Sequence, residues 1–295
     1  MAYGTMSFNN KTGNVKSISG LTNYYTVTSA NIKLVDSLIF TDFIHTSLSG
    51  TSSTANAALY GALANGGTIT MNDSFDRDLF GDSKCYGVVR ISTGTTSNAS
   101  GYSGFTTATI LPGFPTPAAS EVTKYEIECL VRTDTTIFTT SLPGRIKIGF
   151  ASTFTSATPN DGVYFEWNQP ASGGDTNWNI TFLHDSSSVR VDTGVAFAAS
   201  KTYQFYLYVN KNSSGNYTTQ YRVKNITDST DTGLQTASPS GGNAAYPSDT
   251  ADVMQFGGTL TKQTTTVTTP IGILFDYFAA KYQLALTRTY INLFG

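Results

Sequence analysis

The chain has 295 residues, of which only 13% are charged, and its 18 Lys and Arg against 20 Asp and Glu leave a formal net charge of -2. A nearly neutral chain lacks the basic face with which nucleic-acid-binding proteins displace counterions from phosphates. No run reaches the roughly 20 apolar residues of a membrane-spanning helix, and no basic amphipathic helix suits a membrane surface. We therefore expect neither nucleic acid nor a membrane among its partners.

Residues 1–68 are predicted to form an N-terminal arm that attaches the chain to something else. Residues 1–30 are polar and rich in Asn, Ser, Thr and Gly, and such a segment needs contacts from outside to become ordered. Residues 32–45 mix a helical stripe with many strand formers, and helix is slightly favoured. Thr54 as N-cap and Gly66 as terminator bound an Ala- and Leu-rich run typical of a short helix. We expect one or two helices in this arm.

The arm also contains the densest apolar patch of its region, and we expect this patch to be the anchor. The alternative is that the arm adds a strand and a helix to the jelly roll itself. The patch consists of Leu34, Val35, Leu38, Ile39, Phe40, Phe43 and Ile44.

From residue 85 onward, apolar and polar residues alternate in short runs, which is typical of antiparallel strands with one dry and one wet face. A nearly continuous apolar run at 271–278 predicts a strand buried on both faces. Turn-forming clusters at 159–162, 172–175, 212–216 and 238–243 separate the runs. The alternating runs lie at 125–132, 145–150, 163–167, 177–182, 203–209 and 217–223.

A series of strand and turn motifs occurs in a fixed order along this region. The series is Gly87-Val88-Val89-Arg90-Ile91-Ser92-Thr93-Gly94-Thr95-Thr96, Glu128-Cys129-Leu130-Val131-Arg132, Ile146-Lys147-Ile148-Gly149-Phe150, Pro159-Asn160-Asp161-Gly162-Val163-Tyr164-Phe165, Asn177-Trp178, Asp192-Thr193-Gly194-Val195-Ala196, Tyr203-Gln204-Phe205-Tyr206-Leu207-Tyr208-Val209 and Asp276-Tyr277-Phe278. Together these motifs resemble the concanavalin A-like lectin and glucanase jelly roll that recurs in virion proteins of tailed bacteriophages.

The resemblance implies an all-β fold, an antiparallel two-sheet jelly-roll sandwich over residues 69–288, followed by a tail at 289–295. It also implies a structural protein of a phage virion, assembled in the host cytoplasm, which decorates the capsid or forms part of a fibre through its arm. The implied partners are other virion proteins and further copies of the chain in a homotrimer. The alternative is a receptor-binding, lectin-like tail protein that recognises a host surface polysaccharide.

Catalytic patterns are not found in the sequence, and we expect a protein that is not an enzyme. Glycan hydrolases of this superfamily carry carboxylates spaced as E-x-D-x-x-E. Here Glu126 and Glu128 share a strand face, but Val131 occupies the third position. Glu166 would restore a pair only if its strand neighboured theirs. No G-x-S-x-G elbow is present, and neither histidine stands in a triad context.

No cofactor or metal is expected. His45 and His184 are the only histidines, and they show no ligand spacing with the two cysteines. Cys85 and Cys129 lie in apolar alternating runs, where reduced thiols act as small buried hydrophobes.

Exposed aromatic side chains are the candidate contacts for a sugar, because sugars stack their apolar faces on aromatic rings. Trp167 and Trp178 fall on the dry face of their runs and could instead fill the core. The candidate glycan contacts are Tyr164, Tyr206, Tyr208, Trp167 and Trp178.

Overall fold

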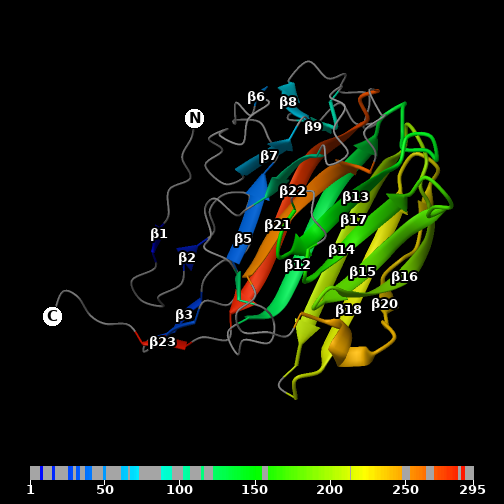
Figure 1. Cartoon of the computed structure of the whole chain (residues 1–295). Coiled ribbons are helices and arrows are strands. Elements are labelled where there is room, and N and C mark those ends of the chain that lie inside the picture. The colour runs from blue at the N-terminus through cyan, green and yellow to red at the C-terminus, as the bar shows by residue number, and fades with distance from the viewer. Residues whose placement is uncertain are drawn as a thin grey trace.

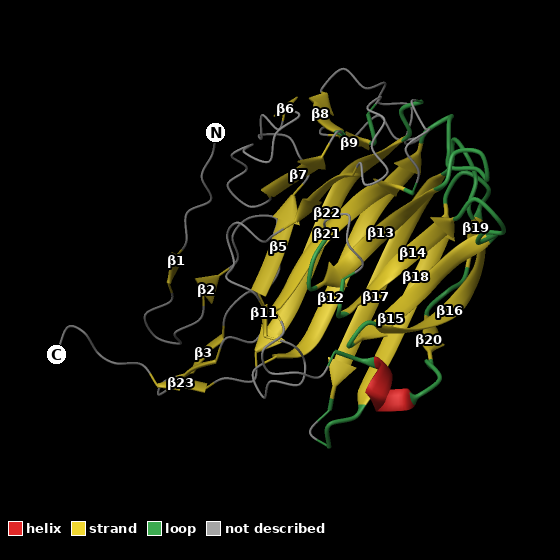
Figure 2. Ribbon diagram, in the orientation of Figure 1, coloured by secondary structure: helices red, strands yellow, loops and turns green. Residues whose placement is uncertain are grey.

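The computed structural model is built almost entirely of strands (Figure 2). In the described part of the chain, a single 3-10 turn, η2 (Gly242–Ala245), is the only helical element. No helix in that part has the length and hydropathy to cross a membrane. The described residues are 7–8, 15–16, 26–28, 31–33, 37–41, 49–50, 61–65, 67–72, 88–94, 102–106, 114–115, 122–154, 159–212, 214–247, 253–263, 269–284 and 287–289.

Sheet 1 has the strand order β16-β15-β14-β13-β21-β10-β7, with β11 also paired to β21. Every pairing in it is antiparallel. Its strands are β7 (Gly61–Asn65), β10 (Tyr102–Thr106), β11 (Phe114–Pro115), β13 (Gly144–Ala151), β14 (Gly162–Gln169), β15 (Asn177–His184), β16 (Ser187–Ala196) and β21 (Val253–Lys262).

Sheet 2 has the order β19-β18-β17-β12-β22-β9-β8-β6, with β20 also paired to β18 and β5 to β22. Its pairings are likewise antiparallel. Its strands are β5 (Ser37–Thr41), β6 (Ser49–Gly50), β8 (Thr68–Asn72), β9 (Val88–Ser92), β12 (Val122–Thr133), β17 (Thr202–Lys211), β18 (Tyr217–Asn225), β19 (Thr230–Asp231), β20 (Gln235–Ala237) and β22 (Gly272–Leu284).

Two smaller groups of strands complete the described elements (Figure 1). One is the pair β1 (Ser7–Phe8) and β2 (Val15–Lys16). The other has the order β23-β4-β3, formed by β23 (Thr287–Thr289), β4 (Asn31–Lys33) and β3 (Thr26–Thr28).

The core lies between the two large sheets and is rich in aromatic rings. Alternation along each strand turns every second side chain inward, as in β17, where Tyr203, Phe205 and Leu207 are fully buried. Trp178 of sheet 1 meets Phe205 of sheet 2 edge to face, with ring centroids 4.8 Å apart. The ring centroid of Phe165, also from sheet 1, lies 4.8 Å from that of Phe205. The expected antiparallel two-sheet jelly roll is confirmed.

The prediction of helices in the arm is wrong for the described residues of this segment, which form strands. In residues 32–45, where helix was slightly favoured, the last two residues of β4 and the whole of β5 are strand, and β5 pairs with β22. Residues 61–65 of the Ala-rich run form β7, which pairs with β10. Pairing with a neighbouring strand outweighs the helix propensity of Ala and Leu. Residues 54–60 lie outside the described residues.

Part of the predicted anchor patch belongs to sheet 2. Leu38, Ile39 and Phe40 lie in β5, opposite Lys281, Ala280 and Ala279 of β22. Strands β5 and β7 thus join the large sheets, whereas the alternative for the arm expected one strand and one helix. The division at residue 68 and the attachment role stay predictions. The other members of the patch lie outside the described residues: Leu34, Val35, Phe43 and Ile44.

Cys129 is free and fully buried in the core, and burial raises the pKa of its thiol. The reduced, hydrophobic role expected for it fits this position. Cys85 lies outside the described residues.

Truncation of Trp178 tests the aromatic core. Trp178→Ala removes a fully buried indole that bridges the sheets, so we expect the free energy of unfolding to fall by about 3–5 kcal/mol. Leu234→Ala is the control, because Leu234 is 58% exposed and its loss should change stability by less than about 0.5 kcal/mol. Urea unfolding of both variants measures the difference, and equal losses would contradict the assignment of the core.

Candidate functional site

Charged and polar side chains are buried on the face of sheet 1 that points away from sheet 2. Lys147 alternates with the core residues Ile146 and Ile148, and it is only 1% exposed. Glu166, which pairs with Lys147 across β13 and β14, is 5% exposed. Buried charges are rare unless they are paired. We call the group formed by Arg145, Lys147, Glu166, Thr181 and Arg190 the polar face.

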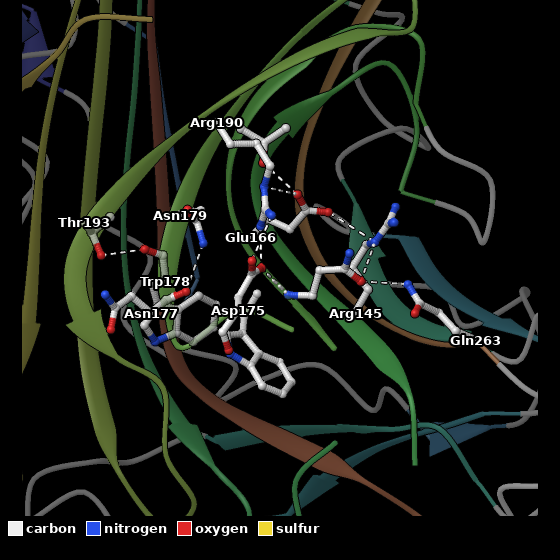
Figure 3. A network of polar contacts seen from close by, with 12 residues as sticks. Arg145, Glu166, Asp175, Asn177, Trp178, Asn179, Arg190, Thr193 and Gln263 are labelled. Carbon is white, nitrogen blue, oxygen red and sulfur yellow. Dashed lines mark hydrogen bonds and ion pairs between the residues drawn. The ribbon is translucent and has the colours of Figure 1, made fainter. Parts of the chain in front are cut away.

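The carboxylate of Glu166 is the centre of the polar face (Figure 3). Arg145 on β13 places its Nε 3.2 Å from Oε1, and Arg190 on β16 places its Nε 3.3 Å from Oε2. The hydroxyl of Thr181 on β15 donates to Oε2 at 2.7 Å. Four neighbouring strands therefore hold this one carboxylate between two guanidinium groups.

A loop carboxylate holds Arg190 from its other side. The Nη1 of Arg190 donates to Oδ1 of Asp175 at 2.9 Å, and its Nη2 pairs with Oδ2. Burial lowers the pKa of Arg190, but the hydrogen bond to Asp175 and the charge of Glu166 outweigh it and leave the pKa above its ordinary value. Asp175 is fixed in turn, because Asn168 donates its backbone N–H to Oδ2 and Trp167 donates its indole N–H to the backbone carbonyl.

Lys147 is a buried lysine whose pKa lies below its ordinary value. Burial lowers its pKa to about 8, and the neighbouring charge of Arg145 adds to this, while Glu166 opposes it. A lysine with such a pKa is partly neutral in mildly alkaline solution and can then accept a proton. Burial raises the pKa of Tyr164, so this phenol stays protonated.

Three of the predicted glycan contacts are buried, and this corrects the prediction for them. Trp167 and Trp178 lie in the core, 4% and 0% exposed, as expected for the dry face of their strands. Tyr164 lies on the other face but is 1% exposed, because it packs in a small cluster with Phe154 and Leu183. None of these three rings has an open face for a sugar.

Tyr206 and Tyr208 are half-buried on the face of sheet 2 that points away from the core. Glu126 and Glu128 lie opposite them on the neighbouring strand β12. Glu166 belongs to sheet 1, so it does not join the other two glutamates in a carboxylate pair.

Among the described residues, one group offers ligand atoms for a metal ion: Asp161, His184 and Asp185, with the atoms within 4.8 Å of one another. Asp161 Oδ1 already lies 3.0 Å from His184 Nδ1 and accepts the backbone N–H of Asp185. These bonds tie the start of β14 to the turn between β15 and β16. This group of possible ligands could not be predicted from spacing, because Asp161 and His184 are far apart along the chain.

Arg145, Arg190 and Asp175 were also missed. The alternation marked Arg145 and Lys147 only as the wet side of a strand. The sequence held one signal of this site: charged residues flanked by apolar ones within a strand, such as Arg190 between Val189 and Val191.

No family model and no curated protein matches the sequence. Among solved structures, a protein of unknown function from Shewanella oneidensis MR-1 is 15% identical, with a TM-score of 0.57 over 93% of this chain and 95% of that one. The lectin UEA-II complexed with galactose is 8% identical, with a TM-score of 0.51 over 85% of this chain and 100% of that one. These likenesses show the jelly-roll fold of concanavalin A-like lectins.

The expectation that the chain is not an enzyme is corrected by a further match. An endo-β-1,4-glucuronan lyase from the fungus Trichoderma reesei is 10% identical, with a TM-score of 0.48 over 82% of this chain and 94% of that one. The missing hydrolase carboxylate pair therefore carries no conclusion about whether the chain is an enzyme.

The pH dependence of stability tests the burial of Lys147. The unfolded chain keeps the lysine proton up to a pKa near 10.5, whereas the folded chain loses it from about pH 8. The unfolded state therefore binds more protons in this window, and stability rises with pH. Between pH 8 and 9.5 we expect a gain of about 1.5 kcal/mol in the wild type relative to Lys147→Met. Urea unfolding across this range measures it, and parallel profiles for the two proteins would contradict the burial of a titrating lysine.

Proposed function

We propose that the chain is a carbohydrate-binding protein and that the polar face of sheet 1 binds an acidic polysaccharide. The observation that carries this proposal is the arrangement of Arg145, Arg190 and Lys147 around the single carboxylate of Glu166. With Asp175 included, three cationic side chains face two carboxylates, and the excess is positive while Lys147 is protonated.

The two guanidinium groups remain accessible to a ligand. The side chains of Arg145 and Arg190 are 25% and 32% exposed, whereas Glu166 between them is 6% exposed. Arginine offers five N–H donors in a planar fork that matches carboxylates and sulfates. An acidic sugar would therefore meet the donors of the polar face before it meets the carboxylate.

The fold supports the carbohydrate part of this proposal. The lectin complexed with galactose shares the jelly roll, although at 8% identity the likeness carries over no binding residue. Recognition of a host surface polysaccharide, the alternative that the sequence raised, is one form of the same function. Membership of a phage virion and assembly into a homotrimer stay predictions.

One observation favours a second candidate function, the cleavage of an acidic polysaccharide by elimination. Elimination requires a base that removes the C5 proton beside the carboxylate of a uronic acid. The electron pair then forms the C4–C5 double bond, the glycosidic C4–O bond breaks, and the leaving oxygen takes a proton from water. Lys147 has a pKa near 8 and lies opposite Glu166. Its neutral amine would accept the C5 proton, and because this side chain is only 1% exposed, the step requires the groups that cover it to move aside when the chain binds.

Binding of acidic polysaccharides tests the proposed function. We expect alginate or polygalacturonate to retard the wild-type protein in affinity electrophoresis, and the neutral polysaccharide dextran to have a smaller effect. Arg145→Gln combined with Arg190→Gln should weaken binding at least about tenfold, because two charged hydrogen-bonding groups are lost. Raising the salt concentration should weaken it as well.

Arg132→Gln is the matched control for this experiment. Arg132 is a partly buried arginine on β12 of sheet 2, and its Nη1 donates to Thr202. Its replacement should leave binding unchanged. Equal binding of the acidic polysaccharide by all three proteins, or equal retardation by that polysaccharide and dextran, would contradict the proposed site.

The second candidate is separated from binding alone by the ultraviolet absorbance of the unsaturated product. Elimination predicts release of this product at a rate that rises as the pH passes about 8, where Lys147 becomes neutral. Lys147→Met should abolish release while alginate binding remains. Binding without any release would restrict the polar face to recognition.

A further inference from the structure

A second group of aromatic and acidic side chains lies on the outer face of sheet 2, across the core from the polar face. Tyr206 and Tyr208 on β17 lie opposite Glu128 and Glu126 on β12. Tyr277 lies on β22, the other neighbour of β12. We call these five residues the tyrosine–glutamate face.

Hydrogen bonds fix the polar ends of these side chains. The hydroxyl of Tyr277 and the amide of Gln204 both donate to Oε1 of Glu128, each at 2.8 Å. Tyr206 is hydrogen-bonded to Glu126, and burial together with this carboxylate raises the pKa of its phenol. Burial and the bond to Glu128 raise the pKa of Tyr277 as well. The three tyrosines are half-buried, which leaves part of each side chain accessible.

The three tyrosines are spread along and across the outer surface of sheet 2. Residues two apart on one strand face are about 7 Å apart, which is the spacing expected between Tyr206 and Tyr208. Strands two places apart in a sheet are separated by about 10 Å, which is the spacing between the strands of Tyr206 and Tyr277. A ligand that uses all three rings must therefore be extended.

The chemistry of the face limits what that ligand can be. The charged groups beside the tyrosines are paired within the face: Nζ of Lys281 lies 3.7 Å from Oε2 of Glu126, and Arg222, opposite Tyr206, donates to Asp231. A ligand without net charge leaves these pairs intact. A second protein chain would have to bury Glu126 and Glu128, and charged residues are depleted from the centre of protein interfaces. Neutral sugars have hydroxyls that donate to carboxylates and apolar ring faces that stack on tyrosine.

We propose that the tyrosine–glutamate face is a second carbohydrate site and that it binds an extended neutral polysaccharide. The two outer faces of the jelly roll then select different glycans. One chain could bridge an acidic and a neutral polysaccharide, because the core separates the two sites. This inference does not depend on acidic polysaccharide binding to sheet 1.

Affinity electrophoresis in neutral polysaccharides tests the second site. The probes are unbranched β-1,4-glucan, β-1,3-glucan, α-1,4-glucan and galactan, each in a separate gel. We expect at least one of them to retard the wild-type protein. Tyr206→Ala combined with Tyr208→Ala should reduce that affinity at least about tenfold, because two stacking rings are lost.

Two further variants keep the result interpretable. Arg145→Gln combined with Arg190→Gln should retain neutral binding, since these residues lie on the other sheet. If the double tyrosine variant does not fold, Tyr208→Ala alone carries the test, with an expected loss of about threefold or more. The proposal is overturned if no probe retards the wild type, if the tyrosine variants bind like the wild type, or if the arginine variant loses neutral binding.

Discussion

The contact of Trp178 with Phe205 joins the two sheets, and the rest of the molecule depends on this aromatic packing. Trp178 comes from sheet 1 and Phe205 from sheet 2, and both are fully buried. Strand alternation then turns the remaining residues of the same strands outward. Each sheet therefore presents one outer face whose composition is not dictated by the core, and both candidate sites lie on these faces.

The two outer faces differ in how deeply their polar side chains are buried. On sheet 1, the charged side chains of Lys147 and Glu166 are buried, and Arg145 and Arg190 pair with the carboxylate of Glu166. On sheet 2, glutamates and tyrosines stay half-exposed and hydrogen-bond across the strands. Buried charge costs stability, so its retention on one face of sheet 1 points to a role other than holding the fold together.

Alternation was enough to predict the strands and to place Trp167 and Trp178 on the dry face of theirs, because one period of two residues governs both; their candidacy as glycan contacts was wrong. It failed for Ser37–Thr41 and Gly61–Asn65, where pairing with β22 and β10 decides the conformation and no local signal reports it. It also failed for Tyr164, whose cover comes from Phe154 beyond the end of β13.

The polar face could not have been derived from the sequence alone. Arg145, Glu166 and Arg190 come from three strands, and Asp175 comes from a loop. Their approach depends on the register of β13, β14, β15 and β16, which alternation leaves open within each strand. The sequence shows the residue types, but the sheet order is needed to see that Arg145 and Arg190 meet at the carboxylate of Glu166.

We propose that Arg145 and Arg190 form the contact surface for an acidic glycan. A crystal structure of the chain with a bound acidic oligosaccharide would show this contact. We expect a sugar carboxylate within hydrogen-bonding distance of one of these two guanidinium groups, on the outer face of sheet 1. An oligosaccharide bound on sheet 2, or at a site without either arginine, would contradict it.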